Sequence, residues 1–163
     1  MKNILNLTTG ALFLALAIFV SCGGKNKDPE PIDPCQVNAD LLTSKTATIS
    51  KVTNPSGTIV TSDWTGFSVT FTGDKSGGSY TTTVGNLTDV SLQNIWAANG
   101  TWSFVGTDTN CKTLTVNGGF TAPRSVAISA ITASGLNLSF NVPEADTGRT
   151  VGIPGNWTFE FTY

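Results

Sequence analysis

The sequence contains no histidine and few charged residues of either sign. Without histidine, the chain cannot form a Ser-His-Asp or Cys-His nucleophile system, or a metal site with imidazole ligands. Charged residues make up only 12% of the chain and the formal net charge is −2, whereas nucleic-acid binding needs a basic face. The hydrophobic content of 39% argues against disorder along the whole chain. The length of 163 residues is compatible with one folded domain.

The chain also lacks an apolar run long enough to span a bilayer. Its longest run, residues 11–20, would cover about 15 Å as a helix, roughly half of the hydrocarbon core. Lys2 supplies a positive charge before this run. A short charged segment followed by a short apolar run is typical of a secretory signal peptide. The alternatives are a short membrane anchor and a core helix.

The apolar run ends in Phe19-Val20-Ser21-Cys22, which resembles the lipobox of bacterial lipoproteins. In that family a small residue precedes a cysteine that is acylated and becomes the mature N-terminus. Phe19 departs from the leucine that the family usually has. The resemblance implies that residues 1–21 are a lipoprotein signal peptide. It also implies that Cys22 is a lipid anchor, whose acyl chains (palmitate among them) hold the mature protein on a membrane.

Residues 22–34 are rich in proline, glycine and charge, which predicts an extended tether that contributes nothing to a core. The acidic residues Asp28, Glu30 and Asp33 resemble the stretch that directs Bacteroidota-type lipoproteins to the outer face of the outer membrane. The resemblance implies a lipid-anchored protein of the outer membrane, and it favours the cell surface over a periplasm-facing position.

The sequence has three cysteines, so acylation of Cys22 would leave Cys35 and Cys111. Two remaining thiols in a secreted chain are typical of a disulfide. The alternative is a pair of free thiols, since many bacterial lipoproteins have no disulfide.

From residue 43 onward, apolar residues alternate with polar ones, which predicts half-buried β-strands. Trp157, Phe159 and Phe161 show this alternation at the C-terminal end. The same pattern marks residues 67–72, 80–84, 102–105, 112–116, 126–131 and 136–142. Turn residues separate these segments at hairpin spacing, and only residues 90–98 could form a short helix. Residues 35–163 are therefore predicted to form a single all-β domain, an antiparallel up-and-down meander that closes to remove its exposed edges.

Four short motifs occur in order along this domain: Trp64-Thr-Gly-Phe-Ser-Val-Thr-Phe71, Gly77-Gly-Ser-Tyr80, Gly100-Thr-Trp-Ser-Phe104 and Ala130-Ile-Thr-Ala-Ser-Gly-Leu-Asn-Leu-Ser-Phe140. Their order resembles that of the lipocalin-like (calycin-like) domains of bacterial surface lipoproteins. The G-x-W motif that usually opens the first strand is absent, and Gly57-Thr-Ile-Val60 stands in its place. The resemblance implies a small lipocalin-like β-barrel over residues 46–163. An immunoglobulin-like β-sandwich is the alternative.

The acidic residues of the domain occur mostly in turns, where aspartate bonds its own backbone. A glycosidase would instead need two carboxylates that converge in a cleft. Asp108 with Asn110, and Glu144 with Asp146, alternate oxygen ligands as a calcium loop does. Each pair falls short of the roughly six to eight oxygens that Ca²⁺ needs. We therefore predict no catalytic residues, no metal site and no cofactor.

The tryptophans fall into two classes. Trp102 and Trp157 lie on the apolar phase of predicted strands, which predicts core packing. Trp64 and Trp96 lie at predicted strand edges beside threonine, asparagine and glycine, where exposed rings could stack on sugars. These two are the candidate ligand contacts. The alternative is that both rings plug the ends of the barrel.

Together these patterns predict a membrane-anchored, non-catalytic envelope lipoprotein that acts as a binding or interaction module for a glycan or a protein, and not for nucleic acid. One alternative is a structural envelope lipoprotein that has no ligand. The other is a carrier of a small apolar ligand inside the barrel. Large residues on predicted inward phases, such as Phe67 and Phe71, disfavour the carrier because they would fill a small barrel.

Overall fold

The computed structural model describes residues 30–163, apart from 88, 90–91, 93–94, 121 and 145–152. The predicted signal peptide, the predicted lipid anchor Cys22 and the first part of the predicted tether lie outside the described residues. The folded unit comprises Ile32–Tyr163. Among the residues described, none of the helices has both the length and the apolar character that crossing a bilayer requires.

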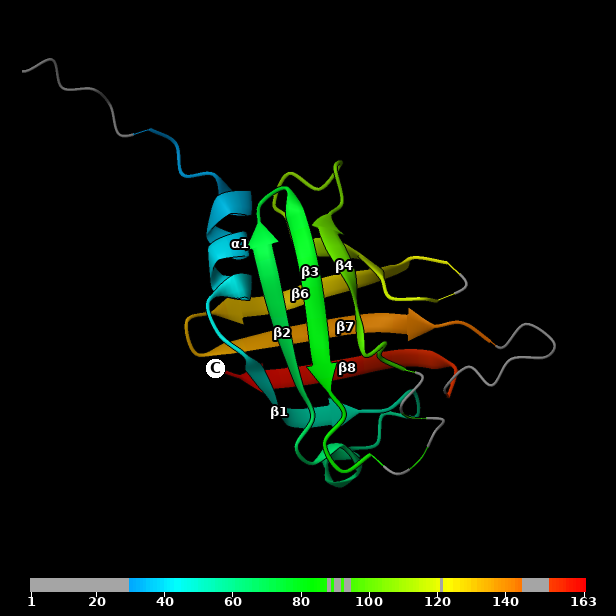
Figure 1. Cartoon of the computed structure of the whole chain (residues 1–163). Coiled ribbons are helices and arrows are strands. Elements are labelled where there is room, and N and C mark those ends of the chain that lie inside the picture. The colour runs from blue at the N-terminus through cyan, green and yellow to red at the C-terminus, as the bar shows by residue number, and fades with distance from the viewer. Residues whose placement is uncertain (1–29, 88, 90–91, 93–94, 121, 145–152) are drawn as a thin grey trace, which may run out of the picture. The chain divides into compact units, whose positions relative to one another are not determined.

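The fold is an antiparallel β-barrel whose strands pair in the order in which they occur in the chain (Figure 1). The strands are β1 (Ala47–Thr53), β2 (Ser68–Asp74), β3 (Gly77–Thr83), β4 (Asn99–Phe104), β5 (Thr113–Asn117), β6 (Arg124–Thr132), β7 (Gly135–Val142) and β8 (Gly155–Thr162). The prediction of an all-β up-and-down meander that closes into a barrel is confirmed, and the immunoglobulin-like alternative is wrong. The arrangement is compatible with a lipocalin-like fold.

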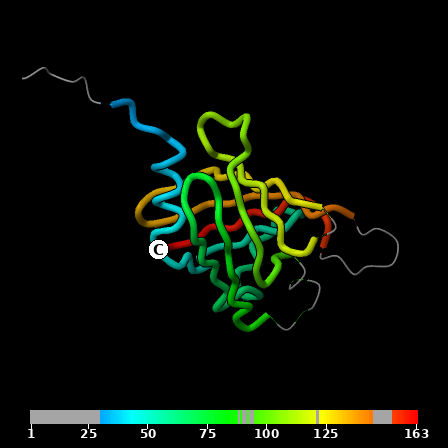
Figure 2. The backbone as a smooth tube through the Cα atoms, turned by 45° about the horizontal axis from the view of Figure 1, so that its top comes forward, coloured from blue at the N-terminus to red at the C-terminus, as the bar shows by residue number. Residues whose placement is uncertain are grey.

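The last strand closes the barrel. β8 pairs along its whole length with β7, and on its other side it pairs with β1 (Figure 2). Closure pairs the first strand with the last, so the sheet has no edge strand with a row of unpaired backbone groups. The C-terminal residues are thus an essential wall of the barrel.

The sequence pattern does not predict β1, because a bulge interrupts its alternation. Ile49 lies opposite Phe161 and Lys51 lies opposite Glu160, so Ser50 is the extra residue. The Ser50 hydroxyl donates a hydrogen bond to the Glu160 carbonyl at 2.8 Å. A bulge of this kind moves the following side chains to the opposite phase. The stretch 57–60 belongs to the connection after β1, where Ile59 forms an isolated bridge with Thr53 and the Val60 N–H donates to the Val52 carbonyl at 2.9 Å.

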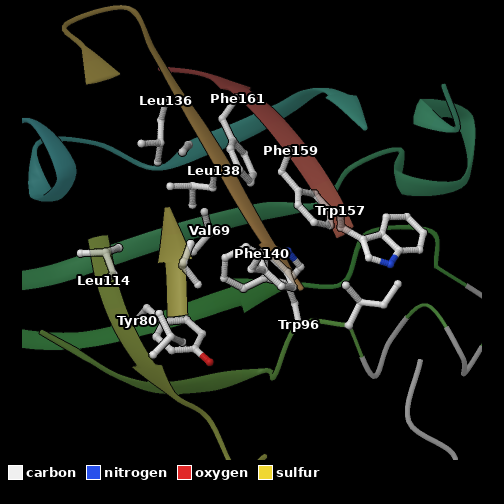
Figure 3. Close-up of a cluster of buried hydrophobic side chains, with 14 of the residues drawn as sticks. Val69, Tyr80, Trp96, Leu114, Leu136, Leu138, Phe140, Trp157, Phe159 and Phe161 are labelled. Atoms are coloured by element: carbon white, nitrogen blue, oxygen red, sulfur yellow. The ribbon is translucent and has the colours of Figure 1, made fainter. Parts of the chain in front are cut away.

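The barrel interior is filled by large apolar side chains (Figure 3). Phe159 lies at the centre of this packing: its ring is stacked with that of Phe140 at a centroid distance of 5.4 Å and with that of Trp157 at 6.1 Å. Phe67 and Phe71 are each only 1% exposed, as their alternating pattern predicts. Such filling is typical of small barrels and leaves the interior to the protein's own side chains.

The helix α1 (Pro34–Thr43) precedes the barrel and is not predicted by the sequence pattern, which assigns its first residue to the tether. The Asp33 carboxylate caps the helix by accepting the Cys35 N–H at 2.9 Å, and Pro34 occupies the first turn. Proline is well suited to that position because its missing N–H would have no intrahelical partner. Ala39 and Leu42 are fully buried where α1 packs against β2 and β6.

The predicted disulfide between Cys35 and Cys111 is confirmed. It joins the first turn of α1 to the connection between β4 and β5. The Asn38 side-chain amide donates to the carbonyls of Asn110 and Cys111, each at 3.1 Å. The helix is therefore attached covalently and by hydrogen bonds to a segment far away in the sequence.

Removing this disulfide should destabilise the barrel strongly. The variant Cys35→Ala/Cys111→Ala is expected to unfold with a free energy lower by about 4 kcal/mol, because a bond across a separation of 76 residues restricts the unfolded chain. Denaturant unfolding of the oxidised wild type and the variant measures this difference. The reduced wild type serves as the control and should match the variant. Equal stability of the oxidised wild type and the variant would contradict the prediction.

Candidate binding surface at the loop end

The strand order places the connections at two opposite ends of the barrel. We call one the hairpin end, since it carries α1 and the turns 75–76, 105–112 and 133–134. We call the other the loop end, because the described parts of the connections 54–67, 84–98, 118–123 and 143–154 lie there. In Figure 1, α1 lies on one side of the barrel, and the 3-10 helix η1 (Thr61–Trp64) lies away from it at the bottom of the view.

Trp64 plugs the loop end and does not present an exposed ring. It is 0% exposed. Its ring makes edge contacts with Phe159 at 4.9 Å, Phe67 at 5.1 Å and Trp157 at 5.9 Å between centroids. η1 turns this side chain inward over the barrel. The interpretation of Trp64 as an exposed platform for sugar stacking is therefore wrong, and the alternative of a plug is correct.

Trp96 is also buried, with 4% of its surface exposed. Its ring lies edge-on to Phe140 at 5.0 Å and to Phe159 at 5.7 Å (Figure 3). The same ring meets Tyr80 at 6.2 Å. Burial of this large aromatic surface stabilises the barrel more than exposure to solvent would. An exposed stacking face at Trp96 is likewise contradicted, although the ring does line the pocket described below.

Arg124 is a buried basic residue that the sequence analysis missed. It is 7% exposed at the start of β6, and its guanidinium lies 3.6 Å from the centre of the Phe120 ring. The guanidinium also donates a hydrogen bond to the Ile95 carbonyl. Burial lowers the pKa of Arg124 to about 10, while the nearby Tyr80 acts in the opposite direction. Arg124 thus joins β6 to the connections 84–98 and 118–123. Alternation alone gives no signal for such a role, because Arg124 is the first residue of its strand.

A small pocket lies between β3 and the connection 84–98. Its volume is about 180 Å³, and its lining residues are Phe67, Thr82, Val84, Leu87, Leu92, Trp96 and Ala98. The Thr82 hydroxyl donates to the Ala97 carbonyl at 3.1 Å, whereas the indole N–H of Trp96 is buried without a hydrogen-bond partner among the described residues. Pockets that enclose a drug-sized ligand measure roughly 300–1,000 Å³. This pocket is therefore too small for a complete metabolite and has the size of a single chemical group.

Exposed aliphatic residues surround this end of the barrel. Ile59 is 63% exposed, Val84 39% and Ile153 45%, and each belongs to a different connection of the loop end. The exposed charged residues that the structure describes at the loop end are all acidic: Asp63, Asp89 and Glu144. The described lysines lie elsewhere. Lys45, Lys75 and Lys112 belong to the hairpin end, and Lys51 in β1 is paired with Glu160 at 2.8 Å.

The structure gives a structural role to Asp108, one of the acidic residues considered for chemistry. The Asp108 carboxylate accepts the N–H groups of Asn110 at 3.1 Å and Lys112 at 2.7 Å, which stabilises the turn between β4 and β5. Asp146, the second residue of the other possible calcium loop, lies outside the described residues. Within the described part of the chain, no group of three or more metal-ligating side chains comes together.

Comparison with protein-family models, with characterised proteins and with solved structures finds no match to this chain.

The plugging role of Trp64 predicts a large loss of stability when its ring is removed. Trp64→Ala should lower the free energy of unfolding by roughly 3–5 kcal/mol, because the truncation leaves a cavity among aromatic rings. Ile59→Ala, in the same connection, is the control and should change stability by less than about 0.5 kcal/mol. Denaturant unfolding compares the two. Similar small effects in both variants would mean that the Trp64 ring contributes no packing.

Burial of the two tyrosines predicts resistance to alkaline ionisation. Burial raises the pKa of Tyr80 to about 12, with the Arg124 charge acting in the opposite direction, and burial also raises the pKa of Tyr163 to about 12. The folded protein should show little tyrosinate absorbance at about pH 11, whereas the unfolded chain should ionise near pH 10. Because the unfolded state then loses its protons first, stability should fall as the pH rises from about 10 to 12.

The variant Tyr163→Phe isolates the absorbance of Tyr80, since the chain has only two tyrosines. Ionisation of Tyr80 near pH 10 in the folded variant would contradict its burial among Trp96 and Phe71.

Proposed function

We propose that this chain is a lipid-anchored, non-catalytic protein of the bacterial outer membrane, whose lipocalin-like barrel presents a binding surface at its loop end. The observation that carries this proposal is the attachment of α1 to the hairpin end. The chain that leads back to Cys22 enters the folded unit just before Pro34, where α1 begins, and the loop end lies at the other end of the barrel. The candidate binding surface is thereby available to a glycan or a protein outside the membrane.

The predicted anchor and tether support attachment of the barrel to a membrane through its N-terminal segment. Cys22 follows a short apolar leader, and about twelve residues separate it from α1. An extended proline-rich segment of that length reaches roughly 35 Å. Several acyl chains on one cysteine would hold the protein stably on a bilayer without a spanning segment. We place it on the cell surface, in agreement with the acidic residues after Cys22.

The filled interior of the barrel favours binding at its surface and disfavours transport of a ligand inside it. Phe140, Trp157 and Phe159 occupy the space that an internal ligand would need. The engagement of Glu160 with Lys51, and of Asp108 with backbone N–H groups, supports a non-catalytic role.

Cell fractionation tests the anchor. The wild-type chain should be found in the membrane fraction with an acylated N-terminal Cys22 by mass spectrometry, and Cys22→Ala should be released in soluble form. The matched control Cys35→Ala should remain in the membrane fraction. Retention of Met1, or an unmodified Cys22 in membrane-bound wild type, would contradict the proposal.

A binding assay tests the surface. The full-length chain in detergent should bind members of a glycan array or of a displayed peptide library, and substitutions at the loop end should weaken that binding. If the chain binds neither the glycan array nor the peptide library, the binding function is overturned and the structural alternative is favoured.

A further inference from the structure

We infer that the disulfide between Cys35 and Cys111 is a redox latch that sets the length of the tether. In the oxidised chain the disulfide holds α1 on the barrel, so the tether ends at Pro34. Reduction by a dithiol releases α1, and the tether then extends as far as β1. The change in tether length rests on the lipid anchor of the proposed function, whereas the release of α1 does not.

α1 has little stability of its own. It has ten residues, whereas an isolated helix shorter than about 12–15 residues is marginal in water. Most of the stability of a short helix in a protein comes from packing of its apolar face. In α1 only Ala39 and Leu42 are buried against the barrel. The helix therefore depends on its other attachments.

The noncovalent attachments of α1 outside this packing are few and mostly exposed. The Asn38 amide donates to the carbonyls of Asn110 and Cys111, each at 3.1 Å. Lys75 forms an ion pair with Asp33 at 2.9 Å, but the two side chains are 51% and 43% exposed. Such a pair contributes little because water and salt screen it. The position of α1 thus depends mainly on the covalent bond.

α1 can leave the barrel without opening it. α1 lies beside β2 and takes no part in the sheet, and residues 44–46, which join it to β1, are exposed (Figure 1). The connection 105–112, which carries Cys111, has hydrogen bonds of its own. The carboxylate and the carbonyl of Asp108 both accept N–H groups within this connection. The half of the latch that belongs to the barrel therefore stays in place.

The redox step is a thiol–disulfide exchange. Cys35 is partly exposed in the first turn of α1, whereas Cys111 is only 3% exposed. One thiolate of a dithiol therefore attacks the Cys35 sulfur, the S–S bond breaks, and Cys111 leaves as a thiolate that takes up a proton.

The second thiol of the reductant then attacks the mixed disulfide. Cys35 leaves as a thiolate and takes up a proton, and the dithiol becomes a disulfide. Two electrons and two protons have then passed to the protein. The Asp108 carbonyl lies 3.5 Å from the Cys111 Sγ, so the S–H of the reduced protein has an acceptor in place.

Release of α1 lengthens the chain between the anchor and the barrel. About twelve residues separate Cys22 from α1, and about 24 separate it from β1. The reach of a stiff extended chain grows in proportion to its length, and that of a flexible chain grows as the square root. The reach of the reduced form is therefore larger by about 1.4-fold to twofold. The barrel can then meet partners further from the membrane.

Hydrogen exchange of the full-length chain in detergent tests the latch. In dithiothreitol, the amides of α1 should exchange at least about tenfold faster than in the oxidised protein, because α1 then opens without the strands. The amides of β7 and β8 should keep their protection. Alkylation followed by mass spectrometry shows that the reduction is complete.

Two variants serve as controls for this experiment. Cys35→Ala/Cys111→Ala should exchange like the reduced wild type and should not respond to dithiothreitol. Asn38→Ala in the oxidised state removes two hydrogen bonds of α1 and keeps the disulfide. It should accelerate the exchange of α1 less than reduction does. An acceleration as large as that of reduction would show that the disulfide is not the latch.

Energy transfer tests the length of the tether. The four tryptophans lie in the barrel domain, so their fluorescence reports the distance to a labelled membrane. The membrane-purified chain is placed in phosphatidylcholine vesicles that contain dansyl-labelled phosphatidylethanolamine. Reduction should lower the transfer efficiency of the wild type. Cys35→Ala/Cys111→Ala should show the lower efficiency with and without dithiothreitol, and Cys22→Ala should show no transfer.

Unchanged protection of α1 after complete reduction would overturn the latch. Loss of protection in the strands together with α1 would also overturn it, because the disulfide would then stabilise the domain as a whole. Release of α1 with unchanged energy transfer would overturn the change in tether length. If α1 is released but no energy transfer is seen in either redox state, the proposed anchor is rejected and the latch is retained.

Discussion

The barrel depends on the pairing of β8 with both of its neighbours. This strand completes the hydrogen bonding of β7 on one side and of β1 on the other, and it carries Trp157, Phe159 and Phe161 into the interior. The same short segment therefore provides both backbone hydrogen bonds to its neighbours and aromatic side chains for the core. Without β8 the sheet would have two open edges, and Phe140 would lose its stacked neighbour.

The two ends of the closed barrel are sealed by different means. At the hairpin end, the disulfide attaches α1 covalently, and Ala39 and Leu42 are buried beneath it. At the loop end, Trp64 and Trp96 seal the interior by packing, and Arg124 joins separate connections through its aromatic contact and its hydrogen bond.

A rigid barrel with long connections at its loop end is suited to recognition. The strands position the loop end through backbone pairing, while the connections supply the groups that a partner would meet.

The sequence by itself determined the strands whose alternation is unbroken, such as β2, β7 and β8, because a period of two separates the inner and outer faces of any strand. It also predicted the disulfide between Cys35 and Cys111, with a pair of free thiols as the alternative that the structure rejects. Only the tertiary structure decided the rest. A bulge at Ser50 hides β1 from a periodic pattern, and the cap formed by Asp33 and Pro34 converts the end of an apparent tether into α1. Trp64, Trp96 and Arg124 lie in connections or at a strand end, where no period relates sequence position to direction. Their burial follows from contacts with strands far away in the chain, which is information that no local pattern contains.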